Sequence, residues 1–311
     1  MLKRLAWLRH TGPFALSSLA LLSSLSADAG RLAIVVDDIG YSRDAGERVL
    51  ALPKSVSIAV LPFTPHAVAL AQRAQAIGKD VLLHQPLESE DESLPPVRTL
   101  TLNMTPDDIK KELEAALNSI PGVKGVSNHT GSRFTRDVAS MNALMSVISA
   151  RGLFFLDTRT TARTVAMGVA SKWGVPALRR DVFLDHDREM EAIDAAFEKA
   201  LAIANRRGHA ILIAHPHDIT LGFLEKRLAG LEETTLVPLS VLTANQAEKL
   251  TTIAVGYNRP TQLLVYSQSR AIYGTKGQSD PLVEGVPSTR GSMVKAILNA
   301  RPNALNIVSA W

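Results

Sequence analysis

The sequence of 311 residues contains no cysteine. Disulfide bonds and thiolate metal sites are therefore excluded, and any bound metal ion must be held by nitrogen and oxygen ligands. The absence of cysteine does not argue against export, because a domain of this size folds without disulfides. Hydrophobic residues make up 46% of the chain. This is enough for a large core, in one large α/β domain or two small ones.

The chain also lacks a stripe of basic residues, although its pI is about 9.4. The formal net charge of +4 comes from the two ends: residues 1–29 carry +2 and residues 244–311 carry +4, which leaves residues 30–243 at −2. Nucleic-acid binding depends on a concentrated positive surface. We therefore expect no nucleic-acid partner for the central region.

Residues 1–29 have the pattern of a secretory signal peptide. Three basic residues come first, an apolar stretch follows at 14–25, and Ala27-Asp28-Ala29 fits the small-x-small cleavage pattern. An uncleaved anchor is the alternative, but the apolar stretch is interrupted by serines and is shorter than the ~20 residues of a spanning helix. The prediction is an exported protein, periplasmic or extracellular, that begins near Gly30 and has no stable membrane span after cleavage.

The segment Arg31–Gly40, RLAIVVDDIG, is predicted to be the central strand of the fold. Five apolar residues, β-branched at three positions, are typical of a strand that is buried on both faces. Asp37 and Asp38 come at its carboxyl end, where α/β proteins build their sites. Neighbouring residues of a strand point to opposite sides, so one carboxylate can ligate a cation while the other serves as a base. The alternative is that one aspartate caps the next helix and the other is solvated.

Strand and helix patterns alternate about seven times between residues 31 and 242. After the first strand, further strands are predicted at 55–61, 80–83, 125–127, 153–156, 182–184, 209–214 and 236–242, and helices at 43–52, 66–77, 106–119, 137–150, 164–173, 190–204 and 219–231. Such alternation favours a parallel sheet with helical crossovers, either a closed barrel or an open doubly wound sheet. Residues 244–311 lose the pattern and are predicted to be an irregular C-terminal extension without an assigned function.

Titratable side chains recur where the predicted strands end. They are Asp37, Asp38, His84, His129, His215 and His217. A single histidine in such a place is more often a hydrogen-bonded residue than a ligand. Because the carboxyl ends of parallel strands share one edge, the whole set predicts a cation site of carboxylates and imidazoles. His66 and His209 lie at the starts of a helix and a strand and are expected to be structural or exposed.

These motifs resemble those of the divergent polysaccharide deacetylases, relatives of the carbohydrate esterases with the NodB-like barrel. The resemblance rests on six motifs in the family's order: VVDDIG at 35–40, LLHQPLE at 82–88, SNHTGSRFT at 127–135, FLDTRT at 155–160, RRDVFLD at 179–185 and AHPHD at 214–218. It covers about residues 31–242. The implied fold is a distorted parallel (β/α) barrel of about seven strands, which assigns a single barrel domain to residues 30–243.

The resemblance also implies a divalent metal ion, with zinc expected, and a division of roles. Asp37 corresponds to the general base, and Asp38 and His129 correspond to metal ligands. The family's second ligating histidine would be residue 133, which is Arg133 here. We expect His84 to replace it, so that Asp38, His84 and His129 form the metal site and leave positions open for water and substrate.

The remaining roles follow from the same resemblance. The histidine that protonates the leaving amine is matched by His215 or, as the second choice, His217. Apart from the resemblance, Arg133, Arg180 and His217 are expected to contact the substrate. An opposite charge from Arg133 or Arg180 could keep Asp37 ionised; the alternative is that such an arginine is a plain surface residue.

The implied activity is metal-assisted removal of N-acetyl groups from a polysaccharide or glycan, such as a cell-wall fragment. One alternative is a barrel that has lost catalysis and binds glycans or envelope partners, which Arg133 favours. A metal-dependent phosphoesterase is a third hypothesis, but the sequence has no Gly-rich phosphate loop. The sequence predicts neither the substrate's identity nor the oligomeric state.

Overall fold

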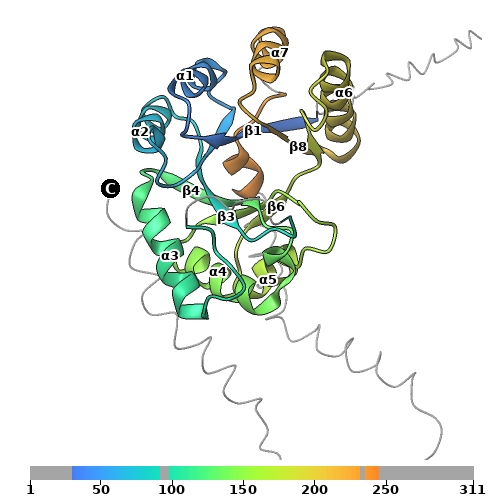
Figure 1. Cartoon of the computed structure of the whole chain (residues 1–311). Coiled ribbons are helices and arrows are strands. Elements are labelled where there is room, and N and C mark those ends of the chain that lie inside the picture. Colours follow the sequence, from blue (N-terminus) through green and yellow to red (C-terminus); the bar gives the residue numbers. More distant parts are fainter. Residues whose placement is uncertain (1–29, 92–97, 232–234, 245–311) are drawn as a thin grey trace, which may run out of the picture. The chain divides into compact units, whose positions relative to one another are not determined.

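The computed structural model describes residues 30–91, 98–231 and 235–244. The signal peptide predicted at 1–29 and almost all of the extension predicted at 244–311 lie outside the described residues, so both stay predictions. The described part contains eight parallel strands that alternate with helices (Figure 1).

The eight strands form one sheet in the order β6-β5-β4-β3-β2-β1-β8-β7. Their bounds are β1 Arg31–Ile39, β2 Ser57–Val60, β3 Val81–Leu87, β4 Val123–Thr130, β5 Phe154–Asp157, β6 Ala177–Arg179, β7 Val182–Phe183 and β8 His209–Ala214. The two strands at the ends of this order, β6 and β7, are separated in the chain by only Arg180 and Asp181. The sheet therefore curls until its ends meet, which confirms the barrel and excludes the open doubly wound sheet.

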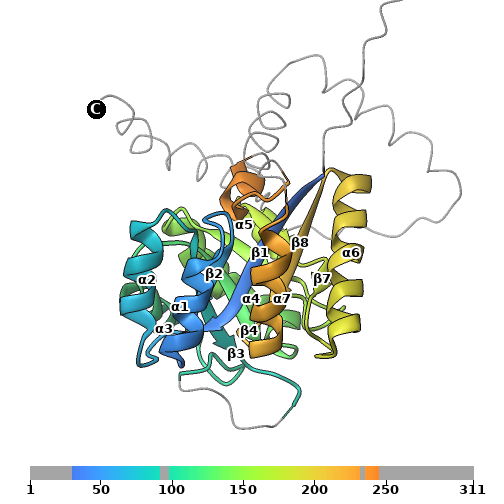
Figure 2. The same cartoon turned by 90° about the horizontal axis from the view of Figure 1, so that it is seen from above.

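Seven α-helices cover the outside of the curled sheet (Figures 1 and 2). They are α1 Arg43–Ala51, α2 Ala67–Ala76, α3 Pro106–Ser119, α4 Val138–Ala150, α5 Ala166–Trp173, α6 Met190–Arg207 and α7 Asp218–Leu228. Each lies where the sequence predicts a helix, and local signals explain why. At α3, Thr105 and Asp108 form a capping box with Pro106 in the first turn, and at α4 the side chain of Asp137 caps Ser140 N–H.

One prediction about the strands is wrong. The strand predicted at 236–242 is not formed: Leu236 makes a single bridge to Leu32, and residues 239–244 are helical. Pro238 explains the difference, because proline has no N–H to donate to a strand ladder. The three-residue strand β6, which is too short to show a pattern in the sequence, is present in addition. The total of eight strands agrees with the barrel of about seven that was expected.

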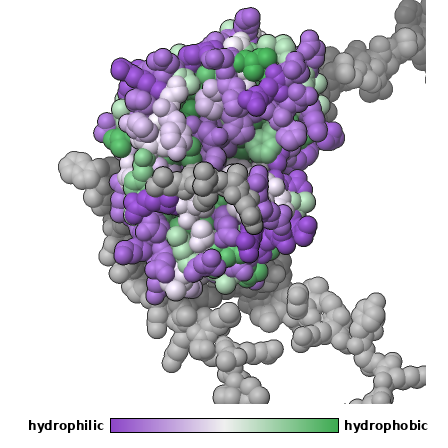
Figure 3. Space-filling view, in the orientation of Figure 1, coloured by the Kyte–Doolittle hydropathy of each residue, from purple (hydrophilic) through white to green (hydrophobic). Residues whose placement is uncertain are grey.

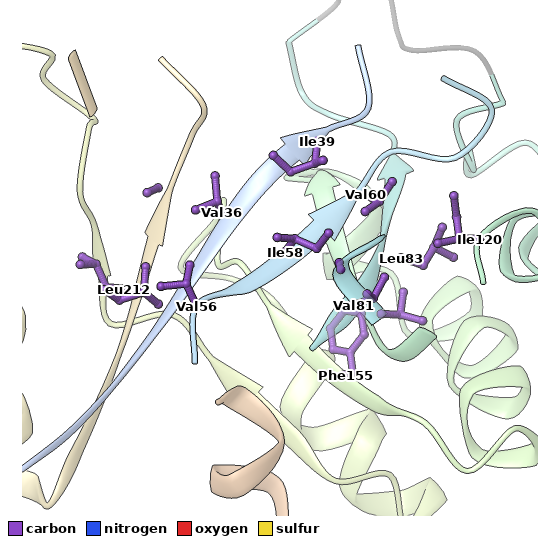
Figure 4. Packing of buried hydrophobic residues seen from close by; sticks show 14 of the residues in the cluster. Val36, Ile39, Val56, Ile58, Val60, Val81, Leu83, Ile120, Phe155 and Leu212 are labelled. Carbon is purple, nitrogen blue, oxygen red and sulfur yellow. The ribbon is translucent and has the colours of Figure 1, made fainter. Parts of the chain in front are cut away.

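Apolar side chains fill both sides of the sheet. The larger cluster lies between the sheet and the helices and includes Val36, Ile58, Leu83 and Leu212 (Figure 4). The smaller cluster lies inside the barrel and consists of Ala33, Val35, Ala59, Leu82, Phe154, Leu156, Leu178, Ile211, Ile213, Leu239 and Leu242. Inward and outward residues thus alternate along each strand, as the two-residue period of a strand requires.

The helical segment 239–244 closes the amino end of the barrel. Its Leu239 and Leu242 belong to the interior cluster. Backbone N–H groups fix its position: Leu239 donates to Ser57 Oγ at 3.4 Å and Ser240 donates to the buried Asp80 carboxylate at 2.8 Å. Because Ser57 and Asp80 lie at the starts of β2 and β3, this end is filled and the carboxyl end is left for the polar residues.

The surface of the described part is mainly polar. In Figure 3 the visible face is largely hydrophilic, with hydrophobic residues scattered over it. None of the helices within residues 30–91, 98–231 and 235–244 combines the length and the apolar character needed to cross a bilayer.

Candidate active site

The polar site lies inside the barrel, next to the interior apolar cluster and at the carboxyl ends of the strands. Inward apolar residues of four strands are Val35, Leu82, Leu178 and Ile213. Two positions farther along the chain lie Asp37 and His84, within β1 and β3, and Arg180 and His215, directly after β6 and β8. Because side chains on a strand repeat with a period of two, these four residues face the same space at the carboxyl end.

Both aspartates of the first motif contact His84. Its Nε2 lies 3.6 Å from Asp37 Oδ2 and 3.2 Å from Asp38 Oδ1. The alternation of a strand predicts that the two carboxylates point to opposite sides, and this prediction is wrong. Asp38 has a φ of +58°, and the register with β2 shifts between Val36 and Ile39, which turns both carboxylates toward the same imidazole.

The structure brings together the three residues predicted to bind metal. His129 Nδ1 lies 2.8 Å from Asp38 Oδ1, and His84 Nε2 contacts the same oxygen. Candidate ligand atoms of Asp38, His84 and His129 all lie within 4.8 Å of one another. On the other side of His84, Nδ1 lies 2.8 Å from the hydroxyl of Ser127, which is fully buried.

Burial and neighbouring charges separate the protonation states of the two aspartates. Burial raises the pKa of Asp37 to about 6, against the opposing influence of His84. Burial would also raise the pKa of Asp38, but hydrogen bonds with His129 and His84 outweigh it and hold this pKa below its ordinary value. For His84, burial is outweighed by the charge of Asp37 and the bond with Asp38, so that its pKa is raised.

This arrangement fits a divalent cation. Two carboxylates and two imidazoles converge, and Asp37 Oδ1 is buried without a hydrogen-bond partner among the residues that the structure describes. A buried polar atom without a partner is costly, so such a group indicates a bound species that the protein chain itself does not supply. Oxygen and imidazole donors in this combination suit zinc and similar divalent ions.

His215 is held from behind by Asp185. Asp185 Oδ1 lies 2.8 Å from His215 Nδ1, and its Oδ2 accepts hydrogen bonds from His215 N–H at 2.7 Å and from Thr220 Oγ1 at 3.0 Å. Burial would lower the pKa of His215, but the bond and the charge of Asp185 outweigh it and raise this pKa to about 9. His215 is therefore mainly a charged proton donor at neutral pH.

His217 is close to this pair but is not held in the same way. Candidate ligand atoms of Asp185, His215 and His217 lie within 4.8 Å of one another. Both oxygens of Asp185 are already hydrogen-bonded to His215 and Thr220, so this group is a hydrogen-bonded pair with a neighbouring histidine. Of the two histidines that the sequence leaves open as acid, His215 is the one that Asp185 holds, and the choice between them stays a prediction.

The two arginines predicted to contact substrate lie in different environments. Arg180 is partly buried at the inner layer, and the charge of Asp37 acts on it. The side chain of Arg133 is 59% exposed and forms an ion pair of 2.9 Å with Glu88. The charges that favour ionised Asp37 come from His84, His215 and His129 rather than from the expected arginines. The substrate contacts of Arg133, Arg180 and His217 stay predictions.

Two residues of the site were missed from the sequence. Ser127 and Asp185 contact His84 and His215 and so orient the side chains that do the predicted chemistry. Both lie inside motifs that carry the family resemblance, SNHTGSRFT and RRDVFLD. A signal was therefore present, but the partner of each residue is distant in the chain and only the fold brings the two together.

Comparison with known proteins gives consistent results. Residues 34–243 match the divergent polysaccharide deacetylase family. The uncharacterized protein YibQ of Escherichia coli (strain K12) is 37% identical over 215 residues, which cover 69% of this chain and 67% of that protein. An uncharacterized protein of Haemophilus influenzae is 34% identical over 234 residues, covering 75% and 84%. The crystal structure of the uncharacterized protein ATU2773 from Agrobacterium tumefaciens C58 superposes with a TM-score of 0.65 at 28% identity, covering 70% of this chain and 90% of that one.

Proposed function

Because the chain belongs to the divergent polysaccharide deacetylase family, we propose that it is a metal-dependent hydrolase that removes N-acetyl groups from a glycan. The observation that carries this proposal is the convergence of Asp37 and Asp38 on His84, with His129 on the same carboxylate. This convergence supplies a set of metal ligands on one side of the site and leaves the Asp37 carboxylate free to act as a base. The raised pKa of His215 gives the other side an acid.

The metal ligands in this proposal are Asp38, His84 and His129. The low pKa of Asp38 keeps it charged at any physiological pH, as a ligand must be. A divalent ion held there would lower the pKa of a water molecule and stabilise negative charge on the acetyl oxygen. We propose zinc, because imidazole and carboxylate ligands suit it.

Asp37 is the proposed general base. With a pKa of about 6 it is mostly ionised at pH 7, yet it is a stronger base than an exposed carboxylate. Asp37 takes a proton from the attacking water while the water oxygen forms a bond with the acetyl carbon. The nitrogen–carbon bond then breaks, and acetate and a free amino sugar are formed.

His215 is the proposed general acid. It is protonated at neutral pH because Asp185 stabilises its positive charge. It donates this proton to the sugar nitrogen as the bond to the acetyl carbon breaks, which makes the amine a better leaving group. A carboxylate with a raised pKa and an imidazole with a raised pKa thus supply a base and an acid at the same pH.

We further propose that the protein works outside the cytoplasm, in the periplasm or the extracellular medium. The support is the sequence pattern of residues 1–29, with its basic start, apolar stretch and Ala27-Asp28-Ala29. A glycan of the cell envelope would be accessible to the protein there.

The experiment is to measure metal content and acetate release with purified protein. We expect about one equivalent of divalent metal per chain, release of acetate from a tetramer of N-acetylglucosamine, and loss of both in Asp38→Ala. The matched control is Asp44→Ala, which changes an exposed aspartate in the first turn of α1. Protein without metal, together with an Asp38→Ala variant that releases acetate as fast as the wild type, would contradict the proposal.

A second candidate function is glycan binding without catalysis. Arg133 favours it, since this residue stands where the resemblance places a second ligating histidine and its side chain pairs with Glu88 instead. Glycan binding that is insensitive to a chelator, with no acetate formed, would support this alternative. Acetate release that a chelator abolishes and zinc restores would exclude it.

A further inference from the structure

Arg180 is held in a fixed orientation at the inner rim of the site. Its Nε donates to the carbonyl of Thr158 at 2.7 Å and its Nη2 donates to the carbonyl of Arg159 at 2.9 Å. Its guanidinium carbon lies 3.6 Å from the centroid of the Phe183 ring. Nη1 makes no hydrogen bond with any residue that the structure describes, so this edge of a rigid donor is available for a ligand.

A second arginine lies beside it. The backbone of Arg159 has a φ of +57°, and its side chain is exposed. Burial and the charge of Arg159 together lower the pKa of Arg180, so the two cations disfavour each other. Within the described residues neither guanidinium forms an ion pair with a carboxylate, whereas Arg48 and Arg73 on the outer helices pair with Glu225 and Glu47.

The charges of Asp157, Asp181 and Asp37 act on Arg180, but none of these acids forms an ion pair with either arginine within the part of the chain that the structure describes. Asp157 is buried; its Oδ1 accepts the backbone N–H of Arg159, and its Oδ2 has no partner among the described residues. Asp181 is engaged with Arg207 at 2.6 Å and with the N–H of Ile211 at 3.0 Å. A fixed guanidinium with an exposed arginine beside it, neither of them paired with a carboxylate of the described residues, is suited to an anion from outside.

The pair lies next to the proposed reaction centre. Phe183, on which Arg180 stacks, has its ring centroid 5.8 Å from that of His215. Arg180 also occupies the same inward layer as Asp37, two residues beyond the interior Leu178. An anion bound by Arg180 would therefore belong to the same ligand whose acetamido group meets His215.

We propose that Arg159 and Arg180 form an anion subsite that binds a carboxylate of the glycan, so that the protein selects acidic N-acetylated glycans over neutral ones. This inference rests on the proposed function and names its class of substrate. A planar guanidinium held by two carbonyls presents its free N–H groups in the plane that a carboxylate needs.

The test is binding of two matched probes to the zinc-loaded protein by calorimetry. One probe is the neutral tetramer of N-acetylglucosamine, and the other is the same tetramer in which one residue is oxidised to a uronate. We expect the wild type to bind the acidic probe about tenfold more tightly. This preference should shrink as salt is raised, because salt screens exposed charges.

Three variants identify the residues responsible. Arg159→Met changes an exposed side chain and should remove most of the preference without affecting the fold. Arg180→Lys keeps the charge but loses the planar fork, so the preference should fall although the protein stays cationic there. Arg73→Met, which changes an arginine paired with Glu47 on the outer helices, should leave the preference unchanged.

Several outcomes would overturn the inference. They are equal binding of the two probes by the wild type, no binding of either probe, or a preference that survives in both Arg159→Met and Arg180→Lys. If the arginines hold only released acetate, added acetate will inhibit hydrolysis of the neutral tetramer in an arginine-dependent way without any preference for the acidic probe. That result would also overturn the inference of an anion subsite for the glycan.

The outcome is separable from that of the proposed function. Binding preference is measured without turnover, and acetate release is measured on its own. A preference that depends on both arginines in a protein that releases no acetate would support the subsite and contradict the hydrolase. Acetate release without any preference would do the reverse.

Discussion

Asp185 contacts His215 twice, through a side-chain bond of 2.8 Å to Nδ1 and a bond of 2.7 Å from the backbone N–H. The first contact fixes which nitrogen of the imidazole is free to face the barrel interior. The second fixes where the residue lies after the end of β8. Thr220 Oγ1 donates to the same carboxylate at 3.0 Å, so Asp185 itself has little freedom.

The first prediction concerns pH and follows from this pair. His215 must be protonated to act as an acid, and its pKa is raised to about 9, so activity should fall as the pH rises through about 9. In Asp185→Asn the charge is lost, and the pKa of His215 should return toward the ordinary ~6.5. The pH above which kcat/KM falls should therefore be about two pH units lower in this variant, whereas kcat/KM at pH 6 should change much less. An unmoved alkaline limb would show that His215 is not the acid.

The second prediction separates the two neighbouring aspartates. Asp37→Asn should keep the metal and lower kcat by about 10²–10⁴-fold, because a general base contributes that much. Asp38→Asn should lose metal first, and a large excess of zinc should restore part of its activity. Metal content by elemental analysis and kcat at saturating zinc distinguish the two variants. If both variants lose metal equally, the assignment of Asp37 as base is wrong.

The third prediction concerns Ser127 and His84. The Ser127 hydroxyl lies 2.8 Å from His84 Nδ1. In the tautomer that carries its proton on Nδ1, Nδ1–H donates to this hydroxyl and Nε2 is left for a cation. Removing an outer-shell partner of this kind costs about 10–100-fold in metal affinity. We expect Ser127→Ala to show this loss in a zinc titration, with secondary structure unchanged by circular dichroism.

Ser146→Ala is the matched control for this experiment. Its hydroxyl bonds only to the carbonyl of Ala143 within α4. An affinity for zinc that is the same in Ser127→Ala and in the control would exclude the proposed role of Ser127.

The fourth prediction concerns the glycine that follows the aspartates. Gly40 has a φ of +134°, and a Cβ there would lie 2.0 Å from Thr64 Oγ1. We expect Gly40→Ala to lower the free energy of unfolding by roughly 1–3 kcal/mol, since strained backbone conformations cost about that much. Denaturant unfolding measures this change.

Gly168→Ala is expected to have the opposite effect on the free energy of unfolding. Gly168 lies exposed within α5, and a Cβ there would meet no atom within 4 Å. Alanine should stabilise the helix by about 0.5–1 kcal/mol. If both alanine variants shifted stability in the same direction, the argument from backbone conformation would fail.

Much of the site could be predicted from one general property of parallel sheets. Parallel strands end at one edge, so Asp38, His84 and His129 were expected together although they are far apart in the chain. The structure brings their ligand atoms within 4.8 Å of one another. The helices were predictable for a related reason, since their caps are local and lie in the sequence itself, as at Thr105.

What could not be predicted depends on backbone geometry or on distant partners. The left-handed φ of Asp38 overrides the alternation of a strand, and no sequence pattern signals that an aspartate will adopt it. The bonds of Ser127 and Asp185 join residues 43 and 30 positions away. The helical turn at 239–244 was predicted as a strand because an apolar run within a few residues of a proline is ambiguous.

The helical segment that closes the amino end of the barrel has a consequence for how a polymer can be handled. With Leu239 and Leu242 inside the ring of strands, a glycan has no route through the molecule. Under the proposed function, a long glycan would therefore lie across the open mouth with one acetamido group directed inward, and acetate would leave through the same opening. A hydrolase with this proposed function would act on acetamido groups along the side of a chain rather than thread the chain from one end.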